Sequence, residues 1–231
     1  EPEPGRVLVG AAPETVATVS GGSFRATAVA GSITSVADPA ERKALGRVLL
    51  GSEKDLREHR FCVEDMVARL GPVATDVEAD AEPRLLTLSS IQHLETVITG
   101  IMREGKTVVD ALAALHPTPA VCGYPRDRAL AFLLRREPVR RGWYAGPVGW
   151  FDGNGDGVFV PALRSAVAAG NRWRLYSGAG IVQGSDSDRE WEETRIKFQP
   201  MLRALKDPAT SPSPHEGDVA QANQETGSWA A

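Results

Sequence analysis

Residues 174–197, which read RLYSGAGIVQGSDSDREWEETRIK, predict a strand, a glycine-rich turn and the start of a helix. The chain turns through Gly178 and Gly180. Ser187 followed by Glu190 fits a capping box, in which the two side chains satisfy backbone N–H groups at a helix N-terminus. The helix is therefore predicted to begin at Ser187, directly after the turn.

Acidic residues three positions apart occur on two predicted helices. Glu190 and Glu193 share one face of the helix after the turn, with Lys197 one turn further on. Asp55 and Glu58 form a second such pair on an earlier helix. A solvated charged face explains either pair taken alone. If the helices converge, the two pairs would suit Mg²⁺, which binds a few carboxylates and keeps positions for water and substrate oxygens.

The composition narrows the class of protein. The 231 residues carry a formal net charge of −4, which gives no electrostatic reason to expect nucleic acid or an anionic membrane as a partner. No apolar run is long enough to span a bilayer. Cys62 and Cys122 form no CxxC pair and fit reduced thiols. We therefore predict a cytoplasmic protein that binds neither nucleic acid nor a membrane.

The predicted elements mix strands with helices. Strands are expected at 6–10, 15–19, 24–30, 85–102, 142–151 and 158–167, and helices at 39–70, 107–115, 125–136 and from 187 onward. Gly51 is a weak point of the long helix. The loop 152–157 imitates the first half of a calcium-binding EF-hand. However, its twelfth position would be Leu163, which cannot supply the carboxylate, so we predict a hairpin turn. Residues 206–231 are predicted to be a disordered tail.

Several short motifs follow one another along residues 6–205. They are KDLREH at 54–59, QHL at 92–94, HPTPA at 116–120, GWYAG at 142–146, LR at 163–164, YSGAGI at 176–181 and EWEET at 190–194. Together they resemble the chorismate-utilising enzymes of menaquinone, siderophore and tryptophan biosynthesis. Each motif is weak alone, but their joint occurrence is specific. Within that family, the chain is most similar to isochorismate synthases.

This resemblance implies a fold and a relation to a longer protein. The expected fold class is α+β, with large antiparallel sheets wrapped by helices, and residues 1–205 are expected to form the C-terminal portion of the catalytic domain. The lysine that activates water in the family belongs to an N-terminal half that this chain is expected to lack. We therefore expect residues 1–231 alone to be inactive and poorly soluble, and the full-length enzyme to be monomeric.

The resemblance also implies a reaction and a metal. Chorismate is isomerised to isochorismate as water adds at C2 and the C4 hydroxyl leaves, which needs an acid, a base and a cation, here Mg²⁺. Glu14 matches the general acid and would need a raised pKa. Glu58 and Glu193 match the metal ligands, with Asp55 and Glu190 as water-mediated or alternative ligands.

The remaining implied residues are substrate contacts. Arg164 and Lys197 resemble the clamp on the substrate carboxylates. Backbone or hydroxyl contacts are expected from Gly31, Ser32, Tyr176 and Gly178, and walls of the ring pocket from His93, Ala120 and Tyr144. A packing role is the alternative for each of these residues. Two departures from the pattern are Ala12, where Ser or Thr is usual, and the absence of an arginine from 33–35.

Other reactions on the same scaffold stay open. A salicylate synthase would add pyruvate elimination, and anthranilate or aminodeoxychorismate synthases would use ammonia instead of water. The HPTPA segment at 116–120 favours isochorismate synthase over these. A non-catalytic fragment or interaction module is the alternative of another class. The missing lysine favours that alternative, and the intact carboxylates argue against it.

Overall fold

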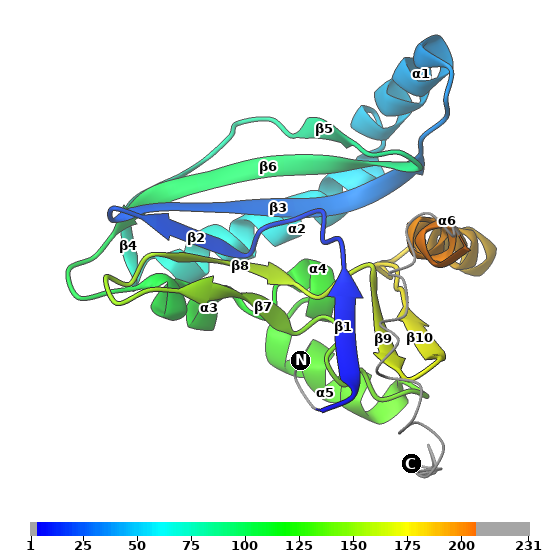
Figure 1. Ribbon diagram of the computed structural model, residues 1–231. Helices are drawn as coiled ribbons and strands as arrows, with labels where there is room; N and C mark the ends of the chain where they lie inside the picture. Colours follow the sequence, from blue (N-terminus) through cyan, green and yellow to red (C-terminus); the bar gives the residue numbers. More distant parts are fainter. Residues whose placement is uncertain (1–3, 207–231) are drawn as a thin grey trace.

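A computed structural model describes residues 4–206, which form two antiparallel sheets flanked by helices (Figure 1). The predicted α+β class with antiparallel sheets is confirmed. The tail was predicted at 206–231; Lys206 is the last residue of the final helix, and residues 207–231 lie outside the described residues. None of the helices within 4–206 is long and apolar enough to cross a membrane. The cytoplasmic location and the monomeric state stay predictions.

The larger sheet has seven strands and is built around two long ones. Its order is β4 (Ala74–Ala79), β6 (Ile91–Met102), β3 (Ser23–Thr34), β2 (Ala17–Ser20), β8 (Gly157–Pro161) and β7 (Pro147–Phe151), with β5 (Arg84–Thr87) also pairing with β6. β3 and β6 run side by side over their whole 12-residue lengths. The smaller sheet has the order β1 (Arg6–Gly10), β9 (Ser165–Ala169) and β10 (Arg172–Tyr176).

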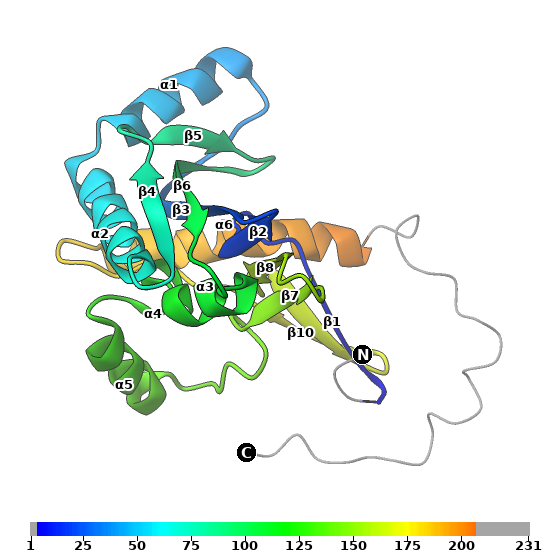
Figure 2. The ribbon, with the colours of Figure 1, turned by 90° about the vertical axis from the view of Figure 1, so that its left-hand side faces the viewer.

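The helices cover one side of the larger sheet and reach toward the smaller one. They are α1 (Pro39–Leu50), α2 (Glu53–Leu70), α3 (Val108–Leu115), α4 (Pro119–Cys122), α5 (Arg126–Arg136) and α6 (Ser187–Lys206). α2 packs across β3 and α3 packs against β2. α5 packs against α4 and lies away from both sheets (Figure 2). α6 contacts β3 and β10 and therefore bridges the sheets.

The core lies between the larger sheet and α2 with α3. Phe24, Ala26 and Ala28 alternate along β3 and point to the helix side, as the period of a strand requires. Met66 and Leu70, four residues apart on one face of α2, pack against them. Small alanines on β3 let the helix approach closely. Truncation of a fully buried side chain such as Leu70 to alanine would cost about 2–5 kcal/mol of folding free energy.

The predicted single helix over 39–70 is wrong, because Gly51 ends α1. The Gly51 N–H donates to the carbonyls of Arg47 and Val48, and the chain then leaves the helical path. Ser52 starts a new helix as its N-cap, with its Oγ accepting a hydrogen bond from the Asp55 N–H at 3.3 Å. The break sets the direction of α2, and with it the positions of the acidic residues in its first turns.

Two of the predicted strands are each divided by a corner. The stretch 85–102 forms β5 and β6, which turn at 88–90, where the Leu88 N–H donates to the Ile91 carbonyl. The stretch 158–167 forms β8 and β9, which belong to different sheets. Arg164 lies between them with φ at 46°, in the left-handed region that non-glycine residues rarely adopt. The periodic sequence pattern continues through both corners and therefore did not reveal them.

Other boundaries also differ from the prediction. β3 continues past Gly31 to Thr34 through a bulge between Ala30 and Ser32. Residues 142–146 form a turn, with Ala145 at a φ of 66°, and only β7 is a strand. β4 and the short helix α4 were not expected. The predicted turn at 152–157 is confirmed as a hairpin between β7 and β8, and the Asp156 carboxylate there accepts hydrogen bonds from the Gly21 N–H.

Candidate active site

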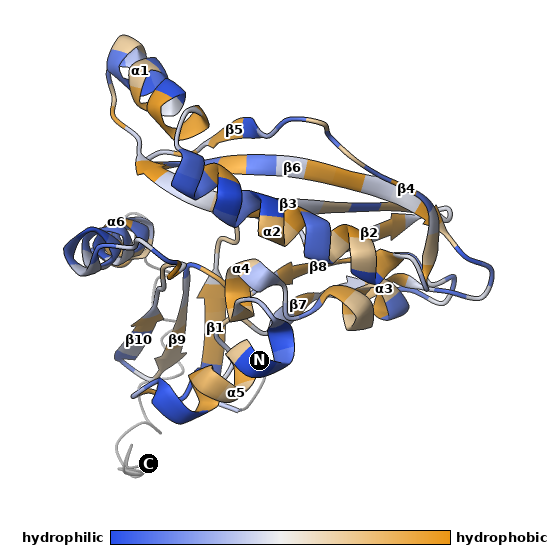
Figure 3. Cartoon of the chain, turned by 180° about the vertical axis from the view of Figure 1, so that it is seen from behind, coloured by the Kyte–Doolittle hydropathy of each residue, from blue (hydrophilic) through white to orange (hydrophobic). Residues whose placement is uncertain are grey.

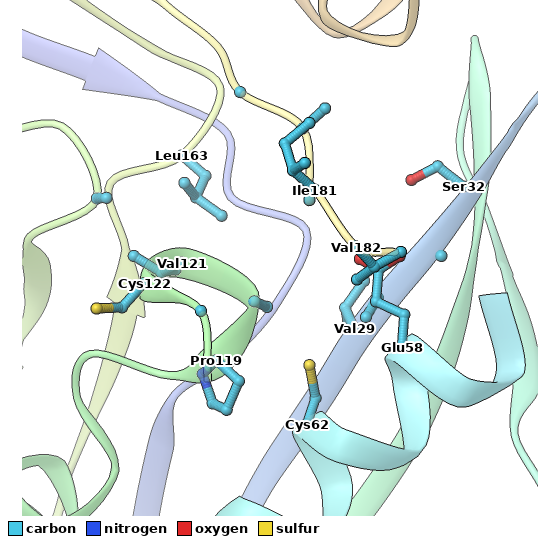
Figure 4. A pocket seen from close by; sticks show the side chains of 18 of the residues that line it. Val29, Ser32, Glu58, Cys62, Pro119, Val121, Cys122, Leu163, Ile181 and Val182 are labelled. Atoms are coloured by element: carbon cyan, nitrogen blue, oxygen red, sulfur yellow. The ribbon is translucent and has the colours of Figure 1, made fainter. Parts of the chain in front are cut away.

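A cavity of about 740 Å³ lies where α2, α4, α6 and the corner between the sheets meet. Figure 4 shows α4 on one side of it and Glu58 and Cys62 of α2 on the other. Every predicted site residue except Tyr176 lines this cavity: Glu14, Gly31, Ser32, Asp55, Glu58, His93, Ala120, Tyr144, Arg164, Gly178, Glu190, Glu193 and Lys197. Residues from distant parts of the sequence are thus brought together, and their roles follow from the local contacts.

Glu58 and Glu193 are the acidic pair that converges from α2 and α6. Burial and, to a smaller extent, the charge of Glu193 together raise the pKa of Glu58 to about 7. The backbone of Gly180 lies against Glu58, because a Cβ at position 180 would overlap the Glu58 Oε1 atom. The negative charges of Glu58 and Glu193 therefore repel each other, and the nearby charges of Lys54 and Lys197 partly offset this repulsion.

Lysines pair with the acidic residues of α6, which is a largely hydrophilic helix (Figure 3). Lys197 Nζ lies 2.6 Å from Glu193 Oε1 and also donates to the Gly178 carbonyl at 3.1 Å. Lys54 Nζ donates to Glu190 Oε1 at 3.0 Å and so links α2 to α6. Burial lowers the pKa of Lys54, but its hydrogen bond with Glu190 and the surrounding negative charges outweigh burial and raise that pKa overall.

Glu14 is a buried carboxyl group that is held near two cations. Only 5% of the residue is exposed, and its Oε1 has no hydrogen-bond partner within residues 4–206. Burial raises the pKa of Glu14 to about 8, although the charges of Lys197 and Arg164 oppose the rise. The raised pKa favours the protonated form of this carboxyl group at neutral pH, the form that could donate a proton.

Arg164 is oriented by His93. Arg164 Nη2 donates to His93 Nε2 at 2.5 Å. On the other side of the ring, His93 Nδ1 lies 3.0 Å from Ser32 Oγ and 3.3 Å from the Gly31 carbonyl oxygen. Burial, with the charges of Arg164 and Lys197, lowers the pKa of His93 to about 3. A neutral ring that accepts at Nε2 carries its proton on Nδ1, where it can donate to the Gly31 carbonyl.

Tyr144 lines the cavity from the turn at 142–146, and Tyr176 lies behind it. The two rings are stacked, with centroids 5.3 Å apart and planes at 12°. Tyr176 lines a smaller cavity of about 220 Å³ on the other side of this wall. Ala120 reaches the main cavity from α4.

Comparison with known proteins identifies the family of the chain. The family model described as "Chorismate binding enzyme" matches residues 1–206. The chain belongs to the chorismate-binding enzyme family. Among its relatives, an isochorismate synthase of Bacillus subtilis named MenF is 39% identical over 201 residues, which is 87% of this chain and 43% of the relative. A salicylate biosynthesis isochorismate synthase of Pseudomonas aeruginosa is 41% identical over 198 residues, which is 86% of this chain and 42% of the relative.

Solved structures of the family have the same fold. A 2,3-dihydroxybenzoate-specific isochorismate synthase from Bacillus anthracis superposes with a TM-score of 0.84 at 37% identity, over 87% of this chain and 54% of that one. Anthranilate synthase component I from Streptococcus pneumoniae superposes with a TM-score of 0.76 at 30% identity, over 87% of this chain and 44% of that one. The chain therefore spans about half the length of the relatives that it matches.

The site of this family member fits a hard divalent cation on chemical grounds. Within residues 4–206, no three His, Cys, Asp or Glu side chains are grouped closely enough to hold a metal ion unaided. Glu58 and Glu193 nevertheless both bring carboxylates to the same cavity, and the charge of Glu193 acts on Glu58. Mg²⁺ is commonly held by one or two carboxylates, with water and substrate oxygens as its other ligands. The donor set therefore matches Mg²⁺ bound together with a substrate.

Some features of the site were not expected from the sequence. Cys62, one helical turn after Glu58, lines the cavity together with Cys122, and both thiols are free and buried. The spacing of four residues from Glu58 could have placed Cys62 on the same helical face. The close approach of Gly180 to Glu58 had no signal beyond the glycine itself.

Proposed function

We propose that this chain forms part of an isochorismate synthase, which isomerises chorismate to isochorismate. The observation that carries the proposal is the position of Glu14, whose buried carboxyl group shares one cavity with Arg164 and Lys197 and has an Oε1 without a hydrogen-bond partner within residues 4–206. Its raised pKa favours the neutral acid. A neutral acid next to two cations suits a reaction that must bind an anionic substrate and protonate a hydroxyl group of it.

Substrate binding is assigned to the cations. Chorismate carries two carboxylates, and the proposed clamp consists of Arg164 and Lys197. The guanidinium of Arg164 can bind a carboxylate in a bidentate manner, and His93 fixes its orientation. Lys197 is held near the cavity by Glu193 and the Gly178 carbonyl. Tyr144 would form a wall of the ring pocket.

Proton transfer is assigned to Glu14. Its carboxyl group would give a proton to the C4 hydroxyl, which leaves as water while another water molecule adds at C2 and loses a proton. The added and the lost water balance, so the reaction is an isomerisation. Lys54 is a poor candidate for the base, since its pairing with Glu190 keeps it protonated. The base is not assigned to a residue of this chain.

A magnesium ion is proposed as the cofactor. Glu58 and Glu193 would hold it, with Asp55 and Glu190 nearby in the same cavity. When bound, Mg²⁺ would supply positive charge that fixes and polarises a substrate carboxylate. The raised pKa of Glu58 supports this assignment, because burial and the charge of Glu193 both disfavour the ionised carboxylate, and a bound cation would offset both effects.

The similarity to relatives supports addition of water over addition of ammonia. The isochorismate synthase from Bacillus anthracis matches at 37% identity, whereas anthranilate synthase component I matches at 30%. Sequence similarity does not indicate which pathway would use the isochorismate, because the relatives include enzymes named for menaquinone, 2,3-dihydroxybenzoate and salicylate.

The test is to incubate the full-length protein with chorismate and Mg²⁺, with and without ammonium, and to separate the products by chromatography. Isochorismate in both mixtures is the expected result. Salicylate with pyruvate would identify a salicylate synthase instead, and anthranilate or aminodeoxychorismate in the ammonium mixture would identify an aminating enzyme. Binding of chorismate without any product would support a non-catalytic module.

A further inference from the structure

Tyr144 lines the cavity from a turn, not from a strand. The Tyr144 N–H donates to the Arg141 carbonyl at 3.0 Å, and the next residue, Ala145, has a φ of 66°. The Ala145 N–H donates to the Ala162 carbonyl at 3.0 Å. These bonds fix the backbone of the turn. In a sheet, side chains on the adjacent strands would pack beside the ring, but a residue in a turn has no such cross-strand neighbours. The direction of the Tyr144 ring therefore depends on what packs behind it.

Tyr176 at the end of β10 packs against this ring. The centroids are 5.3 Å apart and the planes differ by 12°, which is a stacked arrangement. Tyr176 lines the small cavity behind the wall and is absent from the lining of the main one. Its position is thus one layer away from the place where a substrate would bind.

Arg141 forms the second contact with the Tyr144 ring and is itself firmly held. Its Cζ lies 5.8 Å from the ring centroid. Its Nε and Nη2 donate to the Glu137 carboxylate at 2.8 and 2.6 Å, and its Nη1 donates to the Val121 carbonyl at 2.9 Å. The guanidinium is therefore tied to the segments on both sides of α5, and the ring rests against a fixed cation.

We propose that Tyr176, from behind the wall, and Arg141, which also lines the main cavity, are positioning residues that hold Tyr144 in place. Tyr176 acts through its ring, and its hydroxyl makes no contact with substrate, in place of the direct contact that the family resemblance implied. The identity of the ligand, chorismate, rests on the proposed function. The positioning role rests on the stacking and ion-pair geometry.

The experiment compares Tyr176→Phe with Tyr176→Leu in the full-length protein. Phenylalanine keeps the stacked ring and removes the hydroxyl, whereas leucine removes both. Tyr176→Leu is expected to raise KM and Kd for chorismate about tenfold, which is about 1.4 kcal/mol, with kcat within about twofold. Tyr176→Phe is expected to stay within about twofold of the natural protein. Equal losses in both variants would show a hydroxyl contact and overturn the proposal, as would an unchanged KM in Tyr176→Leu.

Coupling to Tyr144 separates positioning from general destabilisation. In a Tyr144→Leu background, Tyr176→Leu is expected to cause no further loss of affinity, because the ring that it supports is gone. Additive losses would overturn the proposal. If Tyr176→Leu does not fold, Arg141→Lys serves the same purpose, with the exposed Arg140→Lys as its matched control. Arg141→Lys is expected to raise KM about threefold only while Tyr144 is present, and an unchanged KM would overturn the role of Arg141.

Direct measurement of chorismate binding by calorimetry keeps this test separate from the proposed function. If the protein turns out to make anthranilate, the proposed function fails. The pattern of Kd values across the Tyr176 and Tyr144 variants would still decide the positioning role. If the chemistry is as proposed but Tyr176→Phe binds as poorly as Tyr176→Leu, only the positioning role fails.

Discussion

The Arg164 guanidinium donates a hydrogen bond to Nε2 of His93 at 2.5 Å, so a buried neutral imidazole orients the proposed substrate clamp. A carboxylate in that place would hold the arginine more tightly but would also cancel its charge. The imidazole orients the guanidinium and leaves its positive charge free to attract an anion. This arrangement explains why a histidine on β6 belongs to the site although it carries no charge.

Arg164→Ala should weaken chorismate binding, because it removes a charge-assisted contact with a substrate carboxylate. The expected loss is about 1.5–3 kcal/mol, seen as a rise in KM. Arg172→Ala, on the exposed part of β10, is the control and should leave KM unchanged. An unaltered KM in Arg164→Ala would remove this residue from the clamp.

His93→Phe should act through Arg164. Without the acceptor at Nε2, the Arg164 guanidinium is no longer held in one orientation. We expect KM for chorismate to rise about tenfold, which corresponds to about 1.4 kcal/mol of binding free energy. In an Arg164→Ala background the same change should add little, since the partner is already absent. Steady-state kinetics on the single and double variants measure the coupling. Independent, additive losses would contradict it.

Glu14→Gln should alter the pH dependence of stability. The pKa of Glu14 is about 8 in the folded protein and 4.5 in the unfolded chain, so the folded state retains a proton between these values. Stability therefore falls as the pH rises from 4.5 to 8. Glu14→Gln should reduce this fall, and the part that remains includes Glu58, whose pKa is raised to about 7. Melting temperatures without Mg²⁺ at several pH values check this, and parallel curves would refute it.

Glu193→Gln should remove most of the stabilisation that Mg²⁺ gives. The variant loses one of the two carboxylates proposed to hold the ion, and we expect Mg²⁺ affinity to fall by at least about tenfold. The readout is the shift in melting temperature on addition of Mg²⁺, with and without chorismate. Glu192→Gln, on the exposed side of α6, is the matched control. A normal response to Mg²⁺ and normal turnover in Glu193→Gln would defeat the metal assignment.

Gly180→Ala should disturb Glu58. The added methyl group would overlap the Glu58 Oε1 atom, so either the loop or the carboxylate must move. Because the overlapped atom is the end of a flexible side chain, we expect the carboxylate to turn away, which weakens Mg²⁺ binding with little change in stability. Gly153→Ala, at a position with open space around it, controls for replacement of a glycine as such. Unchanged Mg²⁺ binding would show that the loop can yield without moving Glu58.

The sequence predicted the strand and helix types well where the periodic pattern was uninterrupted. β1, α3 and α5 lie where expected, and α6 begins at Ser187. The cap of α6 is one residue earlier than predicted, since Asp186 Oδ1 accepts from the Arg189 N–H. The break at Gly51 and the division of 158–167 were missed because both depend on tertiary packing. In each case the apolar pattern continues across the boundary between two elements.

The residues of the candidate site were predicted from the family motifs, and spacing alone could not have placed them. The pairs on α2 and α6 look like ordinary charged helix faces until the helices are seen to converge on one cavity. Tyr176 shows the limit of a motif. The motif identified this position as part of the site, but it could not show that the side chain lies behind the wall of the main cavity and not in its lining. Glu14 shows another limit, because the rise in its pKa comes from burial by residues distant in sequence.

The left-handed corner at Arg164 restricts how this protein can be altered. Residues 162–164 form a short connection between β8 and β9, and loops between strands are the usual places for insertions or new termini. Here the connection carries the chain from one sheet to the other, so one added residue would rotate Arg164 away from His93 and shift β9 relative to β1. The turn at 170–171, within a single sheet, offers the safer place for a tag or a permuted terminus.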